Sequence, residues 1–227
     1  MVNKDYILRI AERYGRFLAI MLHLRAANKH EEALIYIDEL FLQTTGLTTG
    51  FINSASEEML LNMLSPMGVF NVEKCLWMAV LLKEEGDIYE EQEKATESYH
   101  RYLKALHLFL EVEFRTYDIK DLDIAKSILD ILNKLAEYEL PLKTKSKLFR
   151  YFEKIGSYAR AEDILFEMVE AEEKEPAGDE ITGDQVIDEG IDFYKRLLVK
   201  SDADLKAGNL SREEVKEGWE QLQSRKA

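Results

Sequence analysis

The chain has few of the features that stabilise small secreted proteins or anchor a protein in a membrane. Its 227 residues include a single cysteine, Cys75, which excludes an internal disulfide framework and fits a reducing compartment. No uncharged apolar run approaches the ~18 residues that would suggest a membrane span. The N-terminal segment carries charges throughout and lacks the apolar stretch of a signal peptide. We therefore expect a cytoplasmic protein with no membrane partner.

Proline and glycine are also scarce, with three prolines and eleven glycines in the whole chain. This scarcity leaves room for long uninterrupted elements. Apolar residues recur at spacings of three and four, as at Tyr6, Ile10 and Phe17, and no segment shows the alternation of a strand. The hydrophobic content of 46% is enough for a sizeable core. The sequence thus predicts an all-α protein.

Positive charge is in deficit, and the formal net charge is −14. A surface of this sign repels the phosphate backbone of nucleic acids, so we expect no nucleic-acid partner. Neither end of the sequence contains a basic recognition helix that would offset this repulsion.

Motifs of enzyme chemistry are missing as well. The sequence contains no G-x-S-x-G, no P-loop, no G-x-G-x-x-G and no H-E-x-x-H. Cys75 stands among apolar neighbours and is interpreted as a small buried hydrophobic residue. We expect a protein that is not an enzyme, with no catalytic residue, no metal site and no cofactor.

The apolar periodicity divides the chain into helical segments. These cover residues 3–27, 31–43, 56–64, 71–85, 122–138, 141–155, 158–173, 184–200 and 211–223. Residues 44–56 are expected to form a loop, and Ser54 with Glu57 is expected to form the capping box after it. Ser211 and Glu214 have the same spacing. Residues 87–116 form either one long helix that begins after Gly86, or the end of one helix, a turn near residues 91–94 and a second helix.

A repeated pattern of small and aromatic residues favours the second interpretation. Leu82-x2-Glu85-Gly86-x2-Tyr89 is followed by Ser98-x3-Tyr102 and then by Ala105. Weaker versions of the second half occur at Gly156–Ala161 with Leu165, at Asn28–Ala33 with Ile37, and at Asp121–Ala125 with Leu129. This pattern resembles the tetratricopeptide (TPR) repeat over about residues 4–170. The run GLTTGFINSASEEMLLNML also resembles a family of uncharacterised bacterial proteins described as TPR-like.

The resemblance implies antiparallel helical hairpins stacked as an irregular TPR-like solenoid with a C-terminal helical appendage. The expected domains are a repeat domain at residues 1–171, a charged, glycine-containing linker at 172–183 and a helical segment at 184–227. The last segment is expected to dock either on the repeat domain or on a second copy of the chain, and the second alternative would make the protein a homo-oligomer. TPR-like proteins bind protein segments in a groove, which implies a non-enzymatic interaction module.

A basic stripe marks the predicted partner-binding site. Its members are Lys143, Lys147, Arg150 and Lys154. Spacings of four, three and four place them on one face of a helix. The register that the resemblance implies turns this face toward the groove, where it would bind an acidic segment or a C-terminal carboxylate. The alternative is a solvated face paired with nearby carboxylates, and the same two interpretations apply to Arg9, Arg13 and Arg16 on the first helix.

Three further groups of residues have competing interpretations. His100, His107 and Glu111 share a helical stripe, so the alternative function is a metal-binding or enzymatic helical protein; Lys104 between the histidines disfavours a cation. The carboxylate pairs are interpreted as solvated faces; they are Glu84-Glu85, Glu90-Glu91 and Glu172-Glu173. The methionines are interpreted as core residues; they are Met59, Met63, Met67 and Met78.

Overall fold

The described part of the molecule is built from helices alone. A computed structural model describes the backbone of residues 4–115, 123–174 and 181–226, and the side chains of the same residues except 4–11 and 173–174. These residues form twelve α-helices and one 3-10 turn, with no strand among them. The all-α prediction is therefore confirmed for this part of the chain. None of its helices is both long and apolar enough to cross a membrane.

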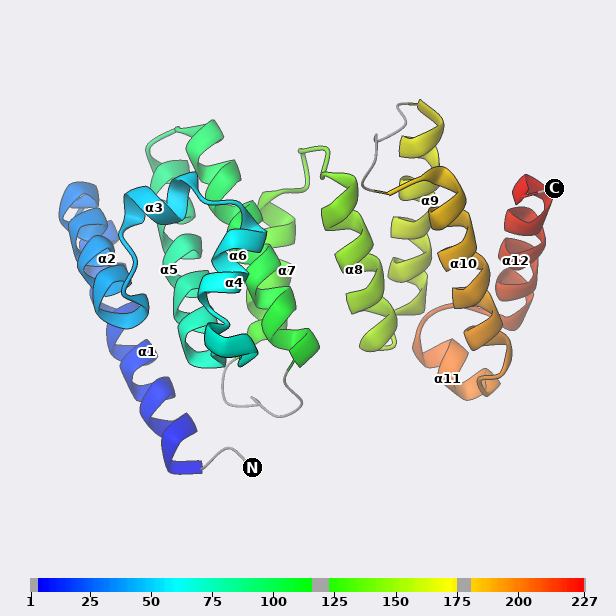
Figure 1. Cartoon of the computed structure of the whole chain (residues 1–227), viewed down its shortest axis with the longest axis horizontal. Helices are drawn as coiled ribbons and strands as arrows, with labels where there is room; N and C mark the ends of the chain where they lie inside the picture. Colours follow the sequence, from blue (N-terminus) through cyan, green and yellow to red (C-terminus); the bar gives the residue numbers. More distant parts are fainter. Residues whose placement is uncertain (1–3, 116–122, 175–180, 227) are drawn as a thin grey trace. The chain divides into compact units, whose positions relative to one another are not determined.

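Figure 1 shows the helices of the described residues. In chain order they are α1 (Lys4–Ala26), α2 (His30–Thr45), α3 (Thr49–Ser54), α4 (Glu57–Met63), the 3-10 turn η1 (Pro66–Gly68), α5 (Val72–Glu91), α6 (Ala95–Arg115), α7 (Ile124–Lys134), α8 (Leu142–Lys154), α9 (Tyr158–Lys174), α10 (Gly183–Leu198), α11 (Asp202–Ala207) and α12 (Arg212–Lys226).

The chain divides into two compact units, Met1–Tyr138 and Glu139–Ala227. This division differs from the expected boundaries at 171 and 183. The reason is that α9 packs on α8 before it and also contacts α10 after it. The expected boundary after α9 therefore falls within the second unit and does not separate two units. Residues 175–180 of that expected linker are outside the described residues.

The first unit is organised around the α5–α6 hairpin. Helix α5 continues to Glu91 and α6 begins at Ala95, so residues 87–116 follow the second interpretation, with a turn where it was expected. Helix α2 packs on α5, and α7 packs on α6. Helix α1 contacts both α2 and α5. The small and aromatic positions Ser98, Tyr102 and Ala105 are buried, as the repeat pattern requires.

Two local predictions in this unit are wrong. The expected loop at residues 44–56 contains α3, which begins after Thr48, whose side chain accepts the Phe51 N–H. The cap of α4 is Ser56, whose hydroxyl accepts the Met59 N–H at 3.2 Å. Ser54 cannot serve as this cap because it is the last residue of α3 and donates its hydroxyl to the Phe51 carbonyl at 3.1 Å.

The repeat match on α7 does not coincide with the buried face of this helix. Ala125 and Leu129 are exposed, whereas Ile124, Ile128 and Ile131 are buried. The repeat match that placed a small residue at Ala125 is therefore out of register, because a helix this short is oriented by its three isoleucines. Residues Asp121 and Leu122 of that match lie outside the described residues.

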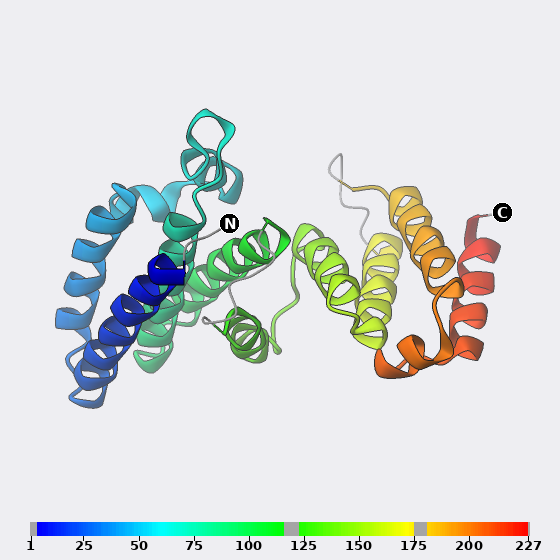
Figure 2. The same ribbon diagram turned by 90° about the horizontal axis from the view of Figure 1, so that it is seen from below.

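The second unit contains two helical hairpins, α8–α9 and α10–α12, with α11 between the helices of the second (Figure 2). Gly156, at a φ of 76°, makes the turn into α9. Ala161 is fully buried, as expected. Phe149 on α8 and Phe193 on α10 form an edge-to-face pair with centroids 5.2 Å apart.

The C-terminal helix docks within its own chain. Val215 and Leu222 of α12 are fully buried, and a Cβ at Gly190 of α10 would lie 2.5 Å from Leu222 Cδ1 and 3.0 Å from Leu165 Cδ1. Helices α9, α10 and α12 thus meet where residue 190 has no side chain. The predicted capping box opens α12, since the Ser211 N–H donates to Glu214 at 2.7 Å and the Glu214 N–H donates to Ser211 at 3.2 Å.

The interpretation of the carboxylate pairs as solvated faces is wrong for Glu84-Glu85, whereas Glu90 and Glu91 are exposed. Glu84 and Glu85 are 5% and 1% exposed. Arg25 of α1 donates to Glu84 at 3.1 Å, and Arg101 of α6 donates to Glu85 at 2.7 Å. Burial is tolerated here because each carboxylate has a cationic partner from another helix. Glu172 is 9% exposed, and the side chain of Glu173 is outside the described residues.

The interpretation of the methionines as core is wrong for three of the four. Met78 is fully buried, whereas Met59, Met63 and Met67 are 49%, 50% and 103% exposed. On α4 the core positions are taken by Leu60 and by Leu64 just after it. The side chains at residues 59 and 63 therefore lie on the other side of this short helix.

Candidate functional site

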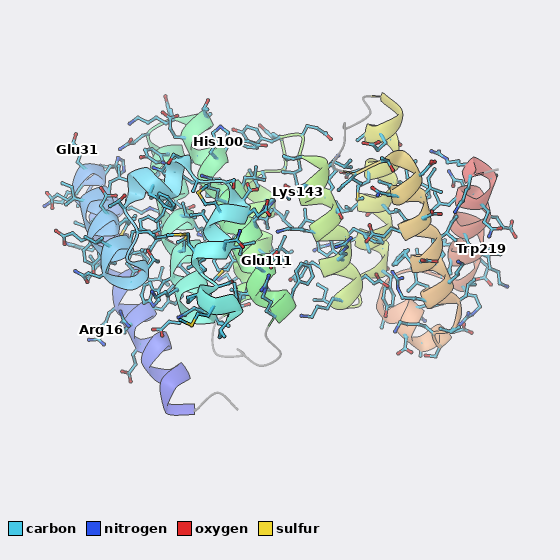
Figure 3. The ribbon with its side chains drawn as sticks, viewed as in Figure 1. Arg16, Glu31, His100, Glu111, Lys143 and Trp219 are labelled. Atoms are coloured by element: carbon cyan, nitrogen blue, oxygen red, sulfur yellow. The ribbon has the colours of Figure 1, made fainter. Side chains whose placement is uncertain are left out.

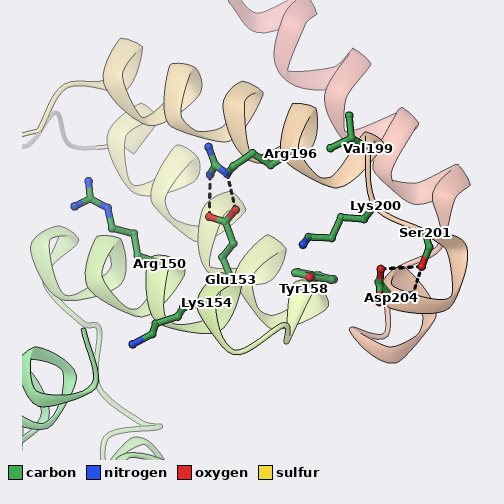
Figure 4. Close-up of a pocket in the computed structure, with 9 residues that line it drawn as sticks. All are labelled: Arg150, Glu153, Lys154, Tyr158, Arg196, Val199, Lys200, Ser201 and Asp204. Atoms are coloured by element: carbon green, nitrogen blue, oxygen red, sulfur yellow. Dashed lines mark hydrogen bonds and ion pairs between the residues drawn. The ribbon is translucent and has the colours of Figure 1, made fainter. Parts of the chain in front are cut away.

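A pocket of about 650 Å³ lies in the second unit, where the ends of α8 and α10 approach α11 (Figure 4). Its lining residues are Arg150, Glu153, Lys154, Tyr158, Arg196, Val199, Lys200, Ser201 and Asp204. Four of them are cationic and two are anionic. The lining is therefore net positive in a chain whose formal charge is −14.

The cations come from two edges of the pocket. Arg150 and Lys154 are four residues apart on α8, and this spacing places them on one side of the helix. Arg196 lies in the last turn of α10, and Lys200 lies two residues beyond the end of that helix. The pocket lies between these two basic edges.

Both arginines are oriented by carboxylates. Arg196 donates from Nε and Nη2 to the two oxygens of Glu153, at 2.6 and 2.8 Å. This two-pronged hydrogen bond raises the pKa of Arg196 and fixes the plane of its guanidinium. Arg150 donates from Nε to Glu189 at 2.7 Å. Arg150 and Arg196 have 60% and 50% of their side-chain surface exposed, so both remain open to solvent beyond these contacts.

An aromatic ring and an aliphatic side chain complete the lining. The Lys200 ammonium lies 5.9 Å from the centroid of the Tyr158 ring, in a cation–π contact. Tyr158 is held by the α11–α12 connection, because the Ala159 N–H donates to the Gly208 carbonyl at 3.0 Å and a Cβ at Gly208 would lie 2.2 Å from Tyr158 Cδ2. Val199 is 86% exposed at the pocket. The lining thus combines positive charge with apolar surface.

The beginning of α11 forms one side of the pocket. Ser201 caps α11: its hydroxyl donates to the Asp204 carboxylate at 2.7 Å and accepts the Asp204 N–H at 3.1 Å. These bonds leave Asp204 with its carboxylate engaged at the cap. The pocket therefore has a fixed frame on the side of α11.

The predicted stripe lies on α8, and half of it reaches the pocket. Arg150 and Lys154 line it, whereas Lys143 and Lys147 stand further toward the start of α8 and are not among the lining residues (Figure 3 labels Lys143). Sequence reasoning missed Arg196, Lys200 and Tyr158. The available signal was the second pair of cations four apart, at the end of the segment predicted at residues 184–200.

The arginines of the first helix do not form a comparable pocket. Arg13 stacks over the ring of Trp77 at 5.4 Å from its centroid and forms an ion pair with Glu73 at 3.4 Å. Arg16 is exposed and donates to the Glu12 carbonyl within its own helix. The side chain of Arg9 lies outside the described residues.

The stripe of the metal-binding alternative is divided between solvent and core. His100 is exposed and forms an edge-to-face contact with Tyr99, whereas His107 is 2% exposed. His107 lies 3.4 Å from Glu57, and Glu111 accepts a hydrogen bond from Arg115 at 3.0 Å. Figure 3 shows His100 and Glu111 separated along α6. Within the described residues no group of three or more histidine, cysteine, aspartate or glutamate side chains could hold a metal ion.

Comparison with known proteins gives a family and no relative of established activity. No curated protein and no solved structure matches the chain. One family model matches it along residues 1–227. The chain therefore belongs to DUF6483, a family of unknown function.

Proposed function

We propose that this chain is a non-enzymatic protein-interaction module whose pocket in the second unit binds an acidic segment or a C-terminal carboxylate of a partner protein. The observation that carries the proposal is the meeting of two basic edges, Arg150 with Lys154 and Arg196 with Lys200, around one pocket. The resemblance to TPR units covers about residues 4–170 and so includes the α8–α9 hairpin, which supplies the edge of Arg150 and Lys154.

The ionic pairs around the pocket favour a carboxylate ligand. Glu153 holds the guanidinium of Arg196 in place, so little side-chain entropy is lost when a second carboxylate approaches its exposed edge. Lys154 and Lys200 add two ammonium groups from opposite edges. A ligand that brings negative charge between them forms charge-assisted hydrogen bonds, each worth ~1.5–3 kcal/mol.

The rest of the surface sharpens this preference. The net charge of −14 repels acidic ligands elsewhere on the chain, so the pocket is favoured as their docking point. Val199 and the Tyr158 ring offer contact area for an aliphatic or aromatic side chain next to the ligand's carboxylate. The preferred ligand is therefore an acidic peptide with an apolar residue beside its charged group.

A peptide array tests the proposal with defined probes. Arrayed acidic peptides with free C-terminal carboxylates are compared with amidated copies and with basic peptides of the same length. The wild-type chain should bind the acidic peptides, and binding should weaken as salt rises. Lys154→Gln combined with Lys200→Gln should weaken binding about tenfold or more, as expected for the loss of two charge-assisted bonds.

The matched control is Lys195→Gln with Lys216→Gln. These lysines are exposed, lie in the same unit and are not among the lining residues, and their replacement changes the net charge equally. An equal loss of binding in this control would show that the pocket variant binds less well only because its overall charge has changed. Undiminished binding by the pocket variant, with its fold intact by circular dichroism, would place the binding surface elsewhere.

A further inference from the structure

A second pocket, of about 280 Å³, lies within the first unit and is lined by residues of α1, α5, α6 and α7. Its apolar lining residues are Leu18, Leu76, Val80, Phe109 and Ile124. A water molecule fills about 30 Å³, so the pocket has room for an organic molecule of about nine non-hydrogen atoms. An apolar lining with a few polar groups is typical of small-molecule sites.

Glu84 of α5 lines this pocket although it is only 5% exposed. One of its oxygens, Oε2, accepts a hydrogen bond from Arg25 at 3.1 Å. The other oxygen, Oε1, accepts no hydrogen bond within the described residues, and the Lys83 ammonium lies 3.9 Å from it. Because a buried oxygen without a hydrogen bond is costly, Glu84 provides an acceptor for a donor placed in the pocket.

The cations around Glu84 do not fully compensate its burial. Burial raises the pKa of Glu84, and the charge of Asp87 adds to the shift. Lys83 and Arg25 lower this pKa, but the net direction is upward. Lys83 is also shared, since its ammonium donates to Asp87 at 3.1 Å. A further positive charge beside Glu84 would therefore stabilise the ionised carboxylate.

Tyr14 of α1 and Asp130 of α7 add two more acceptors to the lining. In the part of the chain that the structure describes, neither the Tyr14 hydroxyl nor the Asp130 carboxylate forms a hydrogen bond or an ion pair. Burial raises the pKa of Tyr14 to about 12, and the charges of Glu84 and Asp130 add to the shift. Both carboxylates thus act on this hydroxyl from different helices and make the potential there negative.

The remaining charged residues of the lining are Asp123 and Lys126. The Asp123 carboxylate accepts the Lys126 N–H at 3.0 Å and so caps α7, while the Lys126 side chain is exposed. With three carboxylates and two lysines, the lining is net negative. The pocket therefore suits a ligand that is positively charged at one end and apolar at the other.

We propose that this pocket binds a small primary amine with an apolar body. Its ammonium group has three N–H donors, which match the three acceptors at Glu84, Tyr14 and Asp130. Its body lies against the apolar lining residues. This site is independent of the pocket proposed above, because it lies in the other unit and prefers a ligand of the opposite charge.

The test compares four small probes. Phenethylamine has the proposed chemistry, phenethyl alcohol has the same size without charge, hydrocinnamate has a negative charge, and methylamine lacks the apolar body. Binding to the full chain with Trp219→Phe is followed by the fluorescence of Trp77, whose ring lies 6.5 Å from the Tyr14 ring. At about 150 mM salt, where long-range attraction is screened, phenethylamine should bind about tenfold or more tightly than the other three probes.

Three single variants locate the contact. Asp130→Asn removes a lining carboxylate and should weaken phenethylamine binding about fivefold or more. The matched control, Glu137→Gln, removes an exposed carboxylate of the same unit outside the lining and should change affinity less than about twofold. Lys126→Gln removes a lining cation and should strengthen binding. All three side chains are exposed, so each variant should keep the wild-type circular dichroism. Glu84→Gln is less suitable because it also alters the partner of Arg25.

Four outcomes would overturn the proposal. Equal affinity for phenethylamine and hydrocinnamate would mean that charge does not select the ligand. Equal losses in Asp130→Asn and Glu137→Gln would mean that overall charge attracts the amine. Unchanged Trp77 fluorescence at a saturating amine concentration would place binding outside this pocket. Tighter binding of a tripeptide with a central lysine and blocked ends would assign the pocket to a side chain of a partner protein instead of a free amine.

Discussion

The ring of Tyr102 lies against the backbone of Gly86, so closely that a Cβ at residue 86 would stand 2.6 Å from Tyr102 Cε1. The Tyr102 hydroxyl donates to Asp87 at 2.7 Å and to Glu90 at 3.1 Å, which holds the ring in this position. Burial, reinforced by these carboxylates, raises the pKa of Tyr102 above its ordinary value. This contact fixes the crossing of α5 and α6 at the centre of the first unit.

Gly86→Ala should destabilise the first unit by about 1–3 kcal/mol, because the anchored ring cannot move away from the added methyl group. Urea unfolding followed by Trp77 fluorescence in a Trp219→Phe background measures this unit alone, since Trp77 belongs to it. The control is Gly15→Ala within α1, where a Cβ meets no atom within 4 Å. This change should stabilise by up to about 1 kcal/mol through helix propensity. Equal effects of the two substitutions on the free energy of unfolding would show that the Tyr102 ring does not pack against Gly86.

Ala161→Leu should cost about 1–3 kcal/mol, because this alanine is fully buried on α9 and the larger side chain overpacks the site. Ala125→Leu, at another alanine that the repeat pattern selected, should change stability by less than about 0.5 kcal/mol, because that residue is exposed. Urea unfolding is followed by the tryptophan of the unit concerned. An unchanged midpoint for Ala161→Leu would show that the register assigned to α9 is wrong.

The buried carboxylate of Glu85 predicts a pH dependence of stability. Burial raises the pKa of Glu85 to about 7, although the Arg101 guanidinium opposes the shift. The folded chain thus holds this proton more tightly than the unfolded chain, whose glutamate has a pKa of about 4.3. The resulting stabilisation is complete below that value and disappears as the pH rises through about 7.

The wild type should therefore lose stability relative to Glu85→Gln between about pH 5 and 7, by about 1 kcal/mol per pH unit at most. Urea unfolding of both chains at several pH values measures this difference through Trp77. Glu58→Gln, at an exposed carboxylate of α4, controls for the loss of one charge. A wild type that instead gains stability relative to Glu85→Gln as the pH rises would show that Glu85 is ionised in the folded chain and paired with Arg101.

A fragment that ends at residue 171 should lose order in α8 and α9. These helices pack against α10, where Phe149 contacts Phe193 and Leu165 lies beside Gly190, and the fragment lacks α10. Hydrogen exchange read by mass spectrometry should show faster exchange at residues 142–171 than in the full chain, with α5 and α6 unchanged as the internal reference. Equal protection of residues 142–171 in both chains would mean that α8 and α9 are stable without the C-terminal helices, as the expected boundary at 171 implied.

The helices themselves were determined by local sequence. Asn71 marked the start of α5, and Ser211 marked the capping box of α12. The pairing of Gly86 with Tyr102 marked the turn between α5 and α6. Each of these signals acts within one helix or between helices that are neighbours in the chain. The cap at Ser56 escaped prediction because the short helix α3 occupies the residues before it. Short helices carry too few periodic positions to be recognised.

Tertiary structure decided which faces of these helices are buried and where the candidate sites lie. The sequence showed Glu84 beside Glu85 as an acidic pair, and only the approach of Arg25 and Arg101 from other helices made their burial possible. The basic stripe of α8 was visible in the sequence, but the pocket exists because α10 brings Arg196 and Lys200 opposite it. The spacing of apolar residues indicates that a helix has two faces but not which of them is buried. In α4, packing against α6 buries the leucines and leaves Met59 and Met63 exposed.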